Sequence, residues 1–300
     1  MSEITFDDRV AIVTGAGGGL GRAYALELAA RGAAVVVNDL GGSVNGVGGS
    51  DSAAQKVVDE IVAKGGRAAA NHDSVSTPEG GAAIVQTAID SFGKVDIVIN
   101  NAGILRDKSF LKMSWEDLDA VLDVHLRGAF YVSQPAFANM KEHGYGRFVF
   151  TASNAGVFGN FGQANYGAAK AGLVGLSNVL AIEGAKSNIK SNVIMPVAYT
   201  RMTEELLGAN GDQFSPELVV PMTVFLASEA SELTHEAFSA LGGRYARVFT
   251  GLTPGWFAGK GAKPSVEDIA ANLEQIEKQD GYIVPTSIAD ELQSVLPLFE

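Results

Sequence analysis

The feature that constrains this chain most is its opening, where a short apolar run leads through a glycine-rich turn into an amphipathic segment. Residues 10–14 read Val-Ala-Ile-Val-Thr, and glycine stands at positions 15, 17, 18, 19 and 21. Glycine permits a tight turn and a close approach to a pyrophosphate, and a helix that begins near Leu20 offers unpaired N–H groups to phosphate. A glycine run alone can also be a flexible turn. In this setting the pattern predicts a dinucleotide-binding strand, turn and helix, with cofactor contacts at Gly15, Gly19, Leu20 and Gly21.

Apolar runs recur along the chain and alternate with helical stretches. They cover residues 10–13, 34–37, 67–70, 95–99, 147–151 and 189–194. Strands buried on both faces read as continuous apolar runs, and their alternation with helices is typical of a parallel, doubly wound sheet. We therefore predict an α/β, Rossmann-type fold. Ligands of such sheets bind at the carboxyl ends of the strands, which is where Gly15, Asp39, Asn100 and Ser153 fall.

An acidic residue, Asp39, follows the second apolar run. At this distance past a glycine turn, a carboxylate accepts hydrogen bonds from the adenosine ribose hydroxyls and repels a 2′-phosphate. Ala16, Gly17 and Gly18 supply no cation that would offset the carboxylate. The sequence therefore predicts NAD, rather than NADP, as the cofactor.

A serine, a tyrosine and a lysine at positions 153, 166 and 170 specify a chemistry. Tyr166 and Lys170 stand at i and i+4, so they share one face of a helix. A nearby ammonium favours phenolate over phenol, and we expect Lys170 to lower the pKa of Tyr166 toward neutrality. Although Tyr-x-x-x-Lys also occurs by chance in helices, this setting predicts Tyr166 as a general acid/base and Ser153 as a hydrogen-bonding partner of the substrate oxygen.

Three ordered motifs give the chain its resemblance to the short-chain dehydrogenase/reductase family: residues 14–21, residues 100–103, and the set Ser153, Tyr166 and Lys170. The resemblance implies that the glycines and Asp39 hold the cofactor and that Lys170, with Tyr166, lies at the nicotinamide ribose. It also implies cofactor contacts from Asp73, Ser74, Asn100, Ala102 and Gly103.

Five stretches carry a closer resemblance within that family: residues 38–42, 100–110, 124–128, 159–166 and 181–189. They are similar to the (3R)-hydroxyacyl-CoA dehydrogenase region of peroxisomal multifunctional enzyme type 2 and to its stand-alone bacterial relatives, including those implied for sterol side-chain breakdown. This resemblance implies oxidation of a 3-hydroxyacyl-CoA to a 3-oxoacyl-CoA in β-oxidation. Two alternatives stay open, a hydroxysteroid dehydrogenase acting on a free ring hydroxyl and a non-catalytic NAD-binding sensor.

The chain departs from the family in two places. His125 stands where most members carry an asparagine of a proton relay, so it either anchors a relay water or is a satisfied core residue. After the sixth apolar run, Pro196-Val197 replaces a proline-glycine pair, and one residue is missing before Thr200. By resemblance, Pro196 and Thr200 are expected at the nicotinamide amide.

Composition points to a soluble enzyme. The chain has no cysteine, which excludes disulfides and cysteine metal sites, and we predict no metal. No apolar run reaches the roughly 18 residues of a membrane span, and the start is unlike a signal peptide, so we expect a cytoplasmic protein. A net charge of −12 argues against nucleic acid and anionic membranes as partners. Coenzyme A phosphates would then need a local cationic cluster, for which the candidates are Arg106, Lys108, Lys112 and Arg201; otherwise these residues lie on a solvated face.

The end of the chain is predicted to extend a single domain of residues 1–300, with a core of about 1–230 and an extension of about 231–300. Residues 244–257 could supply a seventh strand and a turn, and helices are expected near 266–278 and 286–296. In the resembled subgroup such an extension helps to form a homodimer and lines the substrate entrance. Some aromatic side chains could border an apolar substrate cleft, although core packing is the simpler interpretation: Phe158, Phe161, Trp256 and Phe257. Residues 41–50 are predicted to form a loop, either a mobile surface connection or a flank of the adenosine end of NAD.

Overall fold

The computed structural model describes residues 3–50, 52–200, 203–204, 211 and 213–299. The chain divides into two compact units, Met1–Arg247 and Val248–Glu300. Arg201, one of the candidate phosphate ligands, lies outside the described residues.

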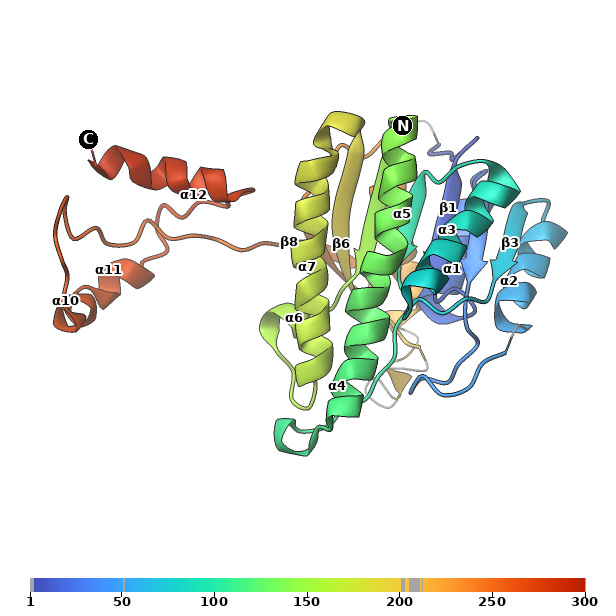
Figure 1. The fold of residues 1–300 in the computed structure, drawn as a ribbon, viewed down its shortest axis with the longest axis horizontal. Helices are drawn as coiled ribbons and strands as arrows, with labels where there is room; N and C mark the ends of the chain where they lie inside the picture. Colours follow the sequence, from blue (N-terminus) through green and yellow to red (C-terminus); the bar gives the residue numbers. More distant parts are fainter. Residues whose placement is uncertain (1–2, 51, 201–202, 205–210, 212, 300) are drawn as a thin grey trace. The chain divides into compact units, whose positions relative to one another are not determined.

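An eight-stranded sheet forms the centre of the first unit, in the order β3-β2-β1-β4-β5-β6-β7-β8 (Figure 1). Neighbouring strands from β3 to β7 are parallel. The order runs outward in both directions from β1 and β4, so the switch point of a doubly wound sheet lies between these two strands. The strands are β1 Val10–Thr14, β2 Ala34–Asn38, β3 Arg67–Asn71, β4 Ile97–Asn100, β5 Gly146–Thr151, β6 Ile189–Val197, β7 Glu236–Leu241 and β8 Arg244–Val248.

The six apolar runs are confirmed as strands β1 to β6, but the expected position of the seventh strand was wrong. The seventh strand is Glu236–Leu241, and the segment expected to be seventh, Arg244–Val248, is the eighth. Glu236–Leu241 alternates between buried and half-buried positions, so it lacks the continuous apolar run that marks the central strands. Gly242 and Gly243 both have positive φ and form a two-residue turn, so β8 runs back along β7.

Helices cover both faces of the sheet. The front of Figure 1 shows α3, α5 and α7, whereas α1, α2 and α9 pack on the opposite face, where Tyr24, Val57 and Val224 join the apolar core of the strands. The helices of this unit are α1 Gly19–Ala30, α2 Ser52–Ala63, α3 Pro78–Phe92, α4 Trp115–Leu122, α5 Gly128–His143, α6 Ala155–Phe158, α7 Ala164–Gly184 and α9 Val220–Ala227. A π-helical turn, Asp123–Arg127, joins α4 to α5.

The second unit has helices, but none of its described residues is buried. Its helices are α10 Val266–Ala271, α11 Leu273–Glu277 and α12 Ile288–Val295, which confirms the two expected helical regions. Capping boxes formed by Ser265 with Asp268 and by Ser287 with Asp290 define where α10 and α12 begin. No described residue from 248 to 299 is buried, and apolar side chains such as Val266 and Ile288 are exposed.

Candidate active site

The glycine turn after β1 is built so tightly that side chains are excluded. Gly15 has a φ of 64°, and a Cβ atom on it would lie 2.7 Å from Ala102 Cα. A Cβ atom on Gly21 would lie 2.3 Å from the Gly15 carbonyl oxygen. Gly19 also has a positive φ, of 52°. The turn therefore presents bare backbone at the start of α1, which is the surface a pyrophosphate needs.

Asn101 and Thr14 hold this turn against the end of β4. The Asn101 side chain donates to the carbonyl oxygens of Thr14 and Gly15 at 3.0 and 3.1 Å. Thr14 Oγ1 in turn accepts from the amides of Asn101 and Ala102, both at 3.0 Å. The sequence interpretation named Asn100 and missed Asn101 and Thr14. Asn100 is instead buried and donates to Ser133 Oγ at 3.0 Å.

Asp39 lies beside the glycine turn, as a ribose ligand would. Its carboxylate accepts from the Gly17 amide at 2.7 Å and from the Gly41 amide at 2.6 Å. A Cβ atom on Gly17 would lie 2.8 Å from the Asp39 carboxylate, so only glycine admits this approach. Because no cation contacts this carboxylate among the described residues, its charge is held by backbone amides alone.

Asp73 and Ser74 follow β3 in a hydrogen-bonded turn next to Asp39's strand. Asn71 accepts from the Asp73 amide and donates to the Asp73 carboxylate, at 3.0 and 2.7 Å. Asn38, the last residue of β2, donates to the Asp73 carbonyl at 2.9 Å. Ser74 Oγ bonds to Ser76 Oγ. These contacts place the two residues at the carboxyl edge of the sheet, on the side of β2 and β3.

Ser153, Tyr166 and Lys170 come together at the same edge. Ser153 follows β5, and its hydroxyl lies close enough to Tyr166, in the first turns of α7, to lower the pKa of that phenol. Lys170 is buried, donates from Nζ to the Thr151 carbonyl at 2.5 Å, and lies 5.4 Å from the centre of the Tyr166 ring. The end of β5 and the start of α7 thus bring the three side chains together in one site.

The acidity of Tyr166 differs from the sequence expectation. Burial raises the pKa of Tyr166 above its ordinary value, and the nearby Ser153 hydroxyl opposes that rise without cancelling it. Burial also lowers the pKa of Lys170 to about 7. Lys170, which was expected to acidify the phenol, is itself buried away from water. Its charged ammonium form is therefore less favoured near neutral pH.

His125 lies in the π-helical turn and is nearly fully buried. Its Nε2 is 3.0 Å from the Ile104 amide and 2.8 Å from the Ile104 carbonyl oxygen, and its ring meets the Tyr166 ring edge-on with centroids 5.2 Å apart. A Cβ atom on Gly103 would lie 2.4 Å from this imidazole. Burial, aided by the charge of Lys170, holds the pKa of His125 well below its ordinary value, so the ring is neutral. Irregular π turns are frequent at functional sites.

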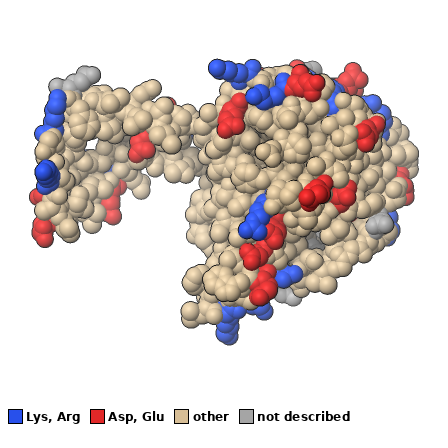
Figure 2. Space-filling model, in the orientation of Figure 1, with Lys and Arg blue, Asp and Glu red and all other residues tan. Residues whose placement is uncertain are grey.

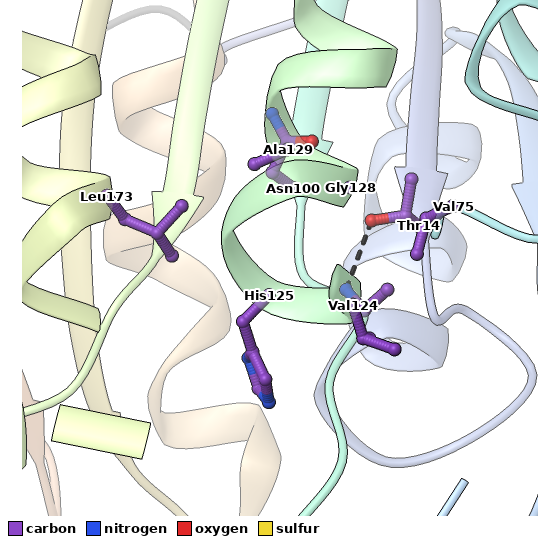
Figure 3. Close-up of a pocket in the computed structure, with 9 residues that line it drawn as sticks. Thr14, Val75, Asn100, Val124, His125, Gly128, Ala129 and Leu173 are labelled. Carbon is purple, nitrogen blue, oxygen red and sulfur yellow. Dashed lines mark hydrogen bonds between the residues drawn. The ribbon is translucent and has the colours of Figure 1, made fainter. Parts of the chain in front are cut away.

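A small cavity of about 10 Å³ lies behind these residues (Figure 3). Thr14 from β1, His125 from the π turn and Leu173 from α7 surround it, with Asn100 at its wall. The dashed line in Figure 3 marks the bond that the Ala102 amide donates to Thr14. A cavity of this size approaches the lower limit for a single water.

The start of α7 is fastened to the segment after β4 by a residue that the sequence interpretation missed. Asn165 is fully buried and donates from Nδ2 to the carbonyl oxygens of Arg106 and Asp117, at 3.0 and 3.2 Å. Its Oδ1 accepts from the Tyr166 amide at 2.8 Å. In the sequence, the only signal for this role is an asparagine directly before the tyrosine. The burial of that asparagine is visible only in the fold.

The proposed phosphate ligands differ in their surroundings. Arg106 pairs with Asp117 at 3.6 Å and donates to the Asn45 carbonyl at 3.2 Å. Lys108 and Lys112 are exposed. Exposed aromatic side chains lie nearby in sequence, at Phe110 and Trp115.

Two of the aromatics singled out from the sequence, Phe158 and Phe161, are 71% and 90% exposed, so core packing is wrong for them. Trp256 is half-buried, and Phe257 packs edge-on against Phe299 in the second unit. Thr200 lies near the glycine turn, since a Cβ atom on Gly19 would be 3.5 Å from Thr200 Cγ2. Pro196 lies in β6, paired with Ala240 of β7.

These residues fit a nicotinamide dinucleotide. The glycine turn is a cradle that a single Cβ atom would fill, and a carboxylate lies beside it on the adenosine side. A hydroxyl, a phenol and a buried amine lie at the other end of the same sheet edge. Fold and site together define a dinucleotide-dependent oxidoreductase.

Residues 9–210 match the family model described as short chain dehydrogenase. The chain belongs to the short-chain dehydrogenase/reductase family, whose members use NAD or NADP and act on small molecules. It is 50% identical over 279 residues to a short-chain type dehydrogenase/reductase of Mycobacterium tuberculosis, covering 91% of this chain and 96% of that protein.

Two further relatives carry more specific names. Hydroxyacyl-CoA dehydrogenase ChsB1 of Mycobacterium tuberculosis is 40% identical over 254 residues, covering 78% of this chain and 77% of that protein. The structure of full-length peroxisomal multifunctional enzyme type 2 from Drosophila melanogaster superposes with a TM-score of 0.82 at 36% identity, over 99% of this chain and 50% of the other. The chain thus spans about half the length of that enzyme.

Within the described residues, none of the helices is long and apolar enough to cross a bilayer. The same part of the chain holds no cluster of three or more His, Cys, Asp or Glu side chains arranged to hold a metal ion.

Proposed function

We propose that this protein catalyses the NAD-dependent oxidation of a 3-hydroxyacyl-CoA to a 3-oxoacyl-CoA in β-oxidation, with a sterol side chain as one candidate acyl group. The observation that carries the proposal is the convergence of Ser153, Tyr166 and Lys170 at the sheet edge that also holds the glycine turn and Asp39. The names of two relatives, a hydroxyacyl-CoA dehydrogenase and a multifunctional enzyme of peroxisomes, support the choice of substrate class.

The proposed roles follow from the contacts. The Ser153 hydroxyl lies close to that of Tyr166, so an alcohol oxygen placed between them would be held by both hydroxyls. Tyr166 takes the proton of that alcohol. Lys170 would donate hydrogen bonds to the hydroxyls of the nicotinamide ribose and supply positive charge behind the phenol. The bound nicotinamide supplies the acceptor for the hydride. Proximity and orientation of the reacting groups carry much of the rate.

Asp39 is the residue that we propose to select NAD. Its carboxylate is already held by the Gly17 and Gly41 amides, in the position where ribose hydroxyls of the adenosine half would donate to it. A 2′-phosphate in that position would meet a negative charge. No described lysine or arginine contacts the Asp39 carboxylate, so the repulsion stands uncompensated.

For the coenzyme A moiety, Lys108 and Lys112 are the candidates with exposed ammonium groups. Arg106 is a weaker candidate, because its guanidinium is already engaged with Asp117 and Asn45. Both lysines lie in the segment that runs past the start of α7. The Lys108 amide bonds this segment to the residues just before α7, because it donates to the Gly162 carbonyl at 2.9 Å.

We also propose that the protein acts as a homodimer. The face formed by α5 and α7 is mostly uncharged (Figure 2) and exposes Phe130, Val179 and Ile182. The second unit exposes apolar side chains, and its residues 248–299 include no buried one, so this part lacks a core that would stabilise it alone. A second copy of the chain would cover both surfaces. Light scattering should give twice the chain mass of 31.2 kDa, and a mass of one chain would contradict this part of the proposal.

The catalytic proposal is tested by following NADH absorbance with three substrates: a short (3R)-hydroxyacyl-CoA, a hydroxyacyl-CoA with a steroid side chain, and a free hydroxysteroid. We expect rapid reduction of NAD with a thioester, slow or no reduction of NADP, and little reaction with the free steroid. Good turnover of the free steroid without turnover of any thioester would reassign the protein as a hydroxysteroid dehydrogenase. NAD binding without turnover of any alcohol would indicate a sensor.

A further inference from the structure

The segment after β4 connects the two ends of the active site. On one side, Leu105 donates its amide to the Val44 carbonyl at 3.0 Å, and Arg106 donates from Nε to the Asn45 carbonyl at 3.2 Å. Residues 44 and 45 belong to the glycine-rich loop 41–50, whose first amide, on Gly41, donates to Asp39. The segment is therefore bonded to the loop that continues directly from the proposed ribose ligand.

The loop itself is folded rather than open. The Ser43 amide donates to the Val47 carbonyl and the Ser50 amide donates to the Leu40 carbonyl, both at 3.0 Å. A Cβ atom on Gly46 would lie 3.1 Å from Ile104 Cδ1. Figure 1 shows this loop, between β2 and α2, at the same edge of the sheet as α4. Of the two alternatives for this loop, its contacts favour a flank of the cofactor site.

On the other side, the same segment is bonded to the start of α7. The Arg106 carbonyl accepts from Asn165, and the Lys108 amide donates to the Gly162 carbonyl. Gln163 donates to the Asp107 carboxylate at 2.7 Å. Because Asn165 also accepts from the Tyr166 amide, the backbone of the catalytic tyrosine is fixed by the segment that holds the loop.

Arg106 is the residue common to both sides. Its backbone carbonyl holds Asn165, while its guanidinium reaches the Asn45 carbonyl and pairs with Asp117, whose own carbonyl accepts from Asn165. A planar guanidinium can serve two such partners at once, whereas an ammonium or an apolar side chain cannot bridge them in the same way.

We propose that Arg106 is a positioning residue that couples occupancy of the Asp39 end of the cofactor site to the placement of Tyr166. A ribose bound at Asp39 tightens the Gly41 bond that anchors the loop, and the loop transmits the change through Arg106 and Asn165. The inference rests on the proposed function, because it assumes that the adenosine half of NAD binds at Asp39.

The test uses ADP, which carries the adenosine and the two phosphates of NAD but lacks the nicotinamide and its ribose, and so does not contact Tyr166 or Lys170 directly. Amide hydrogen exchange is measured on the full chain with and without ADP. In the wild-type protein we expect slower exchange both at residues 15–19 and 39–50 and, by about fivefold, at residues 105–108 and 163–167. Arg106→Met should keep the first effect and lose the second.

A matched control is Arg67→Met, which makes the same substitution at an exposed residue at the amino end of β3, away from the site. It should behave as the wild type does. Arg106→Lys keeps the charge beside Asp117 and should still lose most of the coupling. A steady-state measurement adds a second readout, in which Arg106→Met should lower kcat by about fivefold and leave KM for the CoA thioester within about twofold.

The outcomes separate the inference from the function on which it rests. Protection at residues 15–19 and 39–50 with unchanged exchange at 163–167 in the wild type would overturn the coupling alone. Absence of protection at 39–50 would overturn the cofactor assignment and the coupling with it. A large rise in KM for the thioester in Arg106→Met, with the exchange effects intact, would instead make Arg106 a ligand of the CoA phosphates.

Discussion

The two ends of the active site differ in the groups that form them, which are mainly backbone at one end and mainly side chains at the other. At the proposed adenosine end, backbone predominates: the glycine turn excludes side chains, and the Asp39 carboxylate is held by two amides. At the catalytic end, side chains predominate, and they are buried: Lys170 and His125 are 3% exposed, and the pKa values of both are lowered by burial.

This difference assigns different tasks to the two ends. Bare backbone and a solvated carboxylate bind a cofactor without large desolvation costs, so substitutions there should change affinity and cofactor choice. Poorly solvated side chains have shifted pKa values and are poised for proton transfer, so substitutions there should change turnover. The cost of burying an amine without a carboxylate partner falls on the stability of the fold.

The largest effect is expected from Tyr166→Phe, which removes the hydroxyl and keeps the ring that packs against His125. Loss of the general base should lower kcat by about 10²–10⁴-fold, while the dissociation constant of NAD changes little. Stopped-flow turnover and NAD titration by fluorescence measure the two quantities. Activity close to wild type would contradict the assignment of the catalytic end, and equal loss of NAD binding would erase the contrast between the ends.

Lys170→Met should sharpen the contrast, because turnover and stability should move in opposite directions. The pKa of Lys170 is about 7 in the fold against an ordinary 10.5, so between these values the unfolded chain binds the extra proton and stability rises with pH. Removing the amine should therefore raise the unfolding free energy at pH 6.5 by about 1–4 kcal/mol while turnover falls.

Urea denaturation of wild type and Lys170→Met at pH 6.5 and at pH 9.5 tests this expectation. The gain in stability should shrink at the higher pH, because removing the proton from the lysine of the unfolded chain costs less as the pH approaches 10.5. A variant that is less stable than wild type at pH 6.5 would show that the bond from Lys170 to the Thr151 carbonyl outweighs the desolvation of the amine.

Asp39→Ser tests the adenosine end. Loss of a charged acceptor for the ribose hydroxyls should weaken NAD binding by about 10–100-fold, and removal of the negative charge should narrow the preference of NAD over NADP. Steady-state kinetics with both cofactors measure the ratio, with Tyr166→Phe as the comparison whose cofactor preference should not move. A fall in kcat with unchanged KM for NAD would contradict the assignment of Asp39 to cofactor binding.

The smallest effect is expected from His125→Asn. An amide can donate to the Ile104 carbonyl and accept from the Ile104 amide with separate atoms, whereas the imidazole meets both with Nε2 alone. We expect kcat within about threefold of wild type for His125→Asn and a clearly larger loss for His125→Phe, which removes both bonds. A loss with asparagine as large as with phenylalanine would mean that the imidazole itself takes part in proton transfer.

Much of this architecture could be predicted from the residues because the signals are local. Continuous apolar runs marked β1 to β6, since strands buried on both faces carry no polar alternation, and the glycines marked the turn because close approach excludes every other residue. The strand Glu236–Leu241 was not recognised, because half-buried strands near a sheet edge alternate and lack that signal.

The sequence by itself determined the doubly wound fold and the identity of the glycine turn, Asp39 and the set Ser153, Tyr166 and Lys170, because these depend on residue type and short spacing. Only the tertiary structure decided how acidic the catalytic groups are, since burial depends on everything packed around them: the pKa of Tyr166 is raised, contrary to the expectation from Lys170 alone. It also decided that Asn165 and Arg106 connect the two ends of the site, because their partners are contributed by residues 45 and 117, far from Tyr166 along the chain. Contacts between distant segments leave no mark on local sequence, and these contacts are what unite a cofactor turn and a catalytic helix in one site.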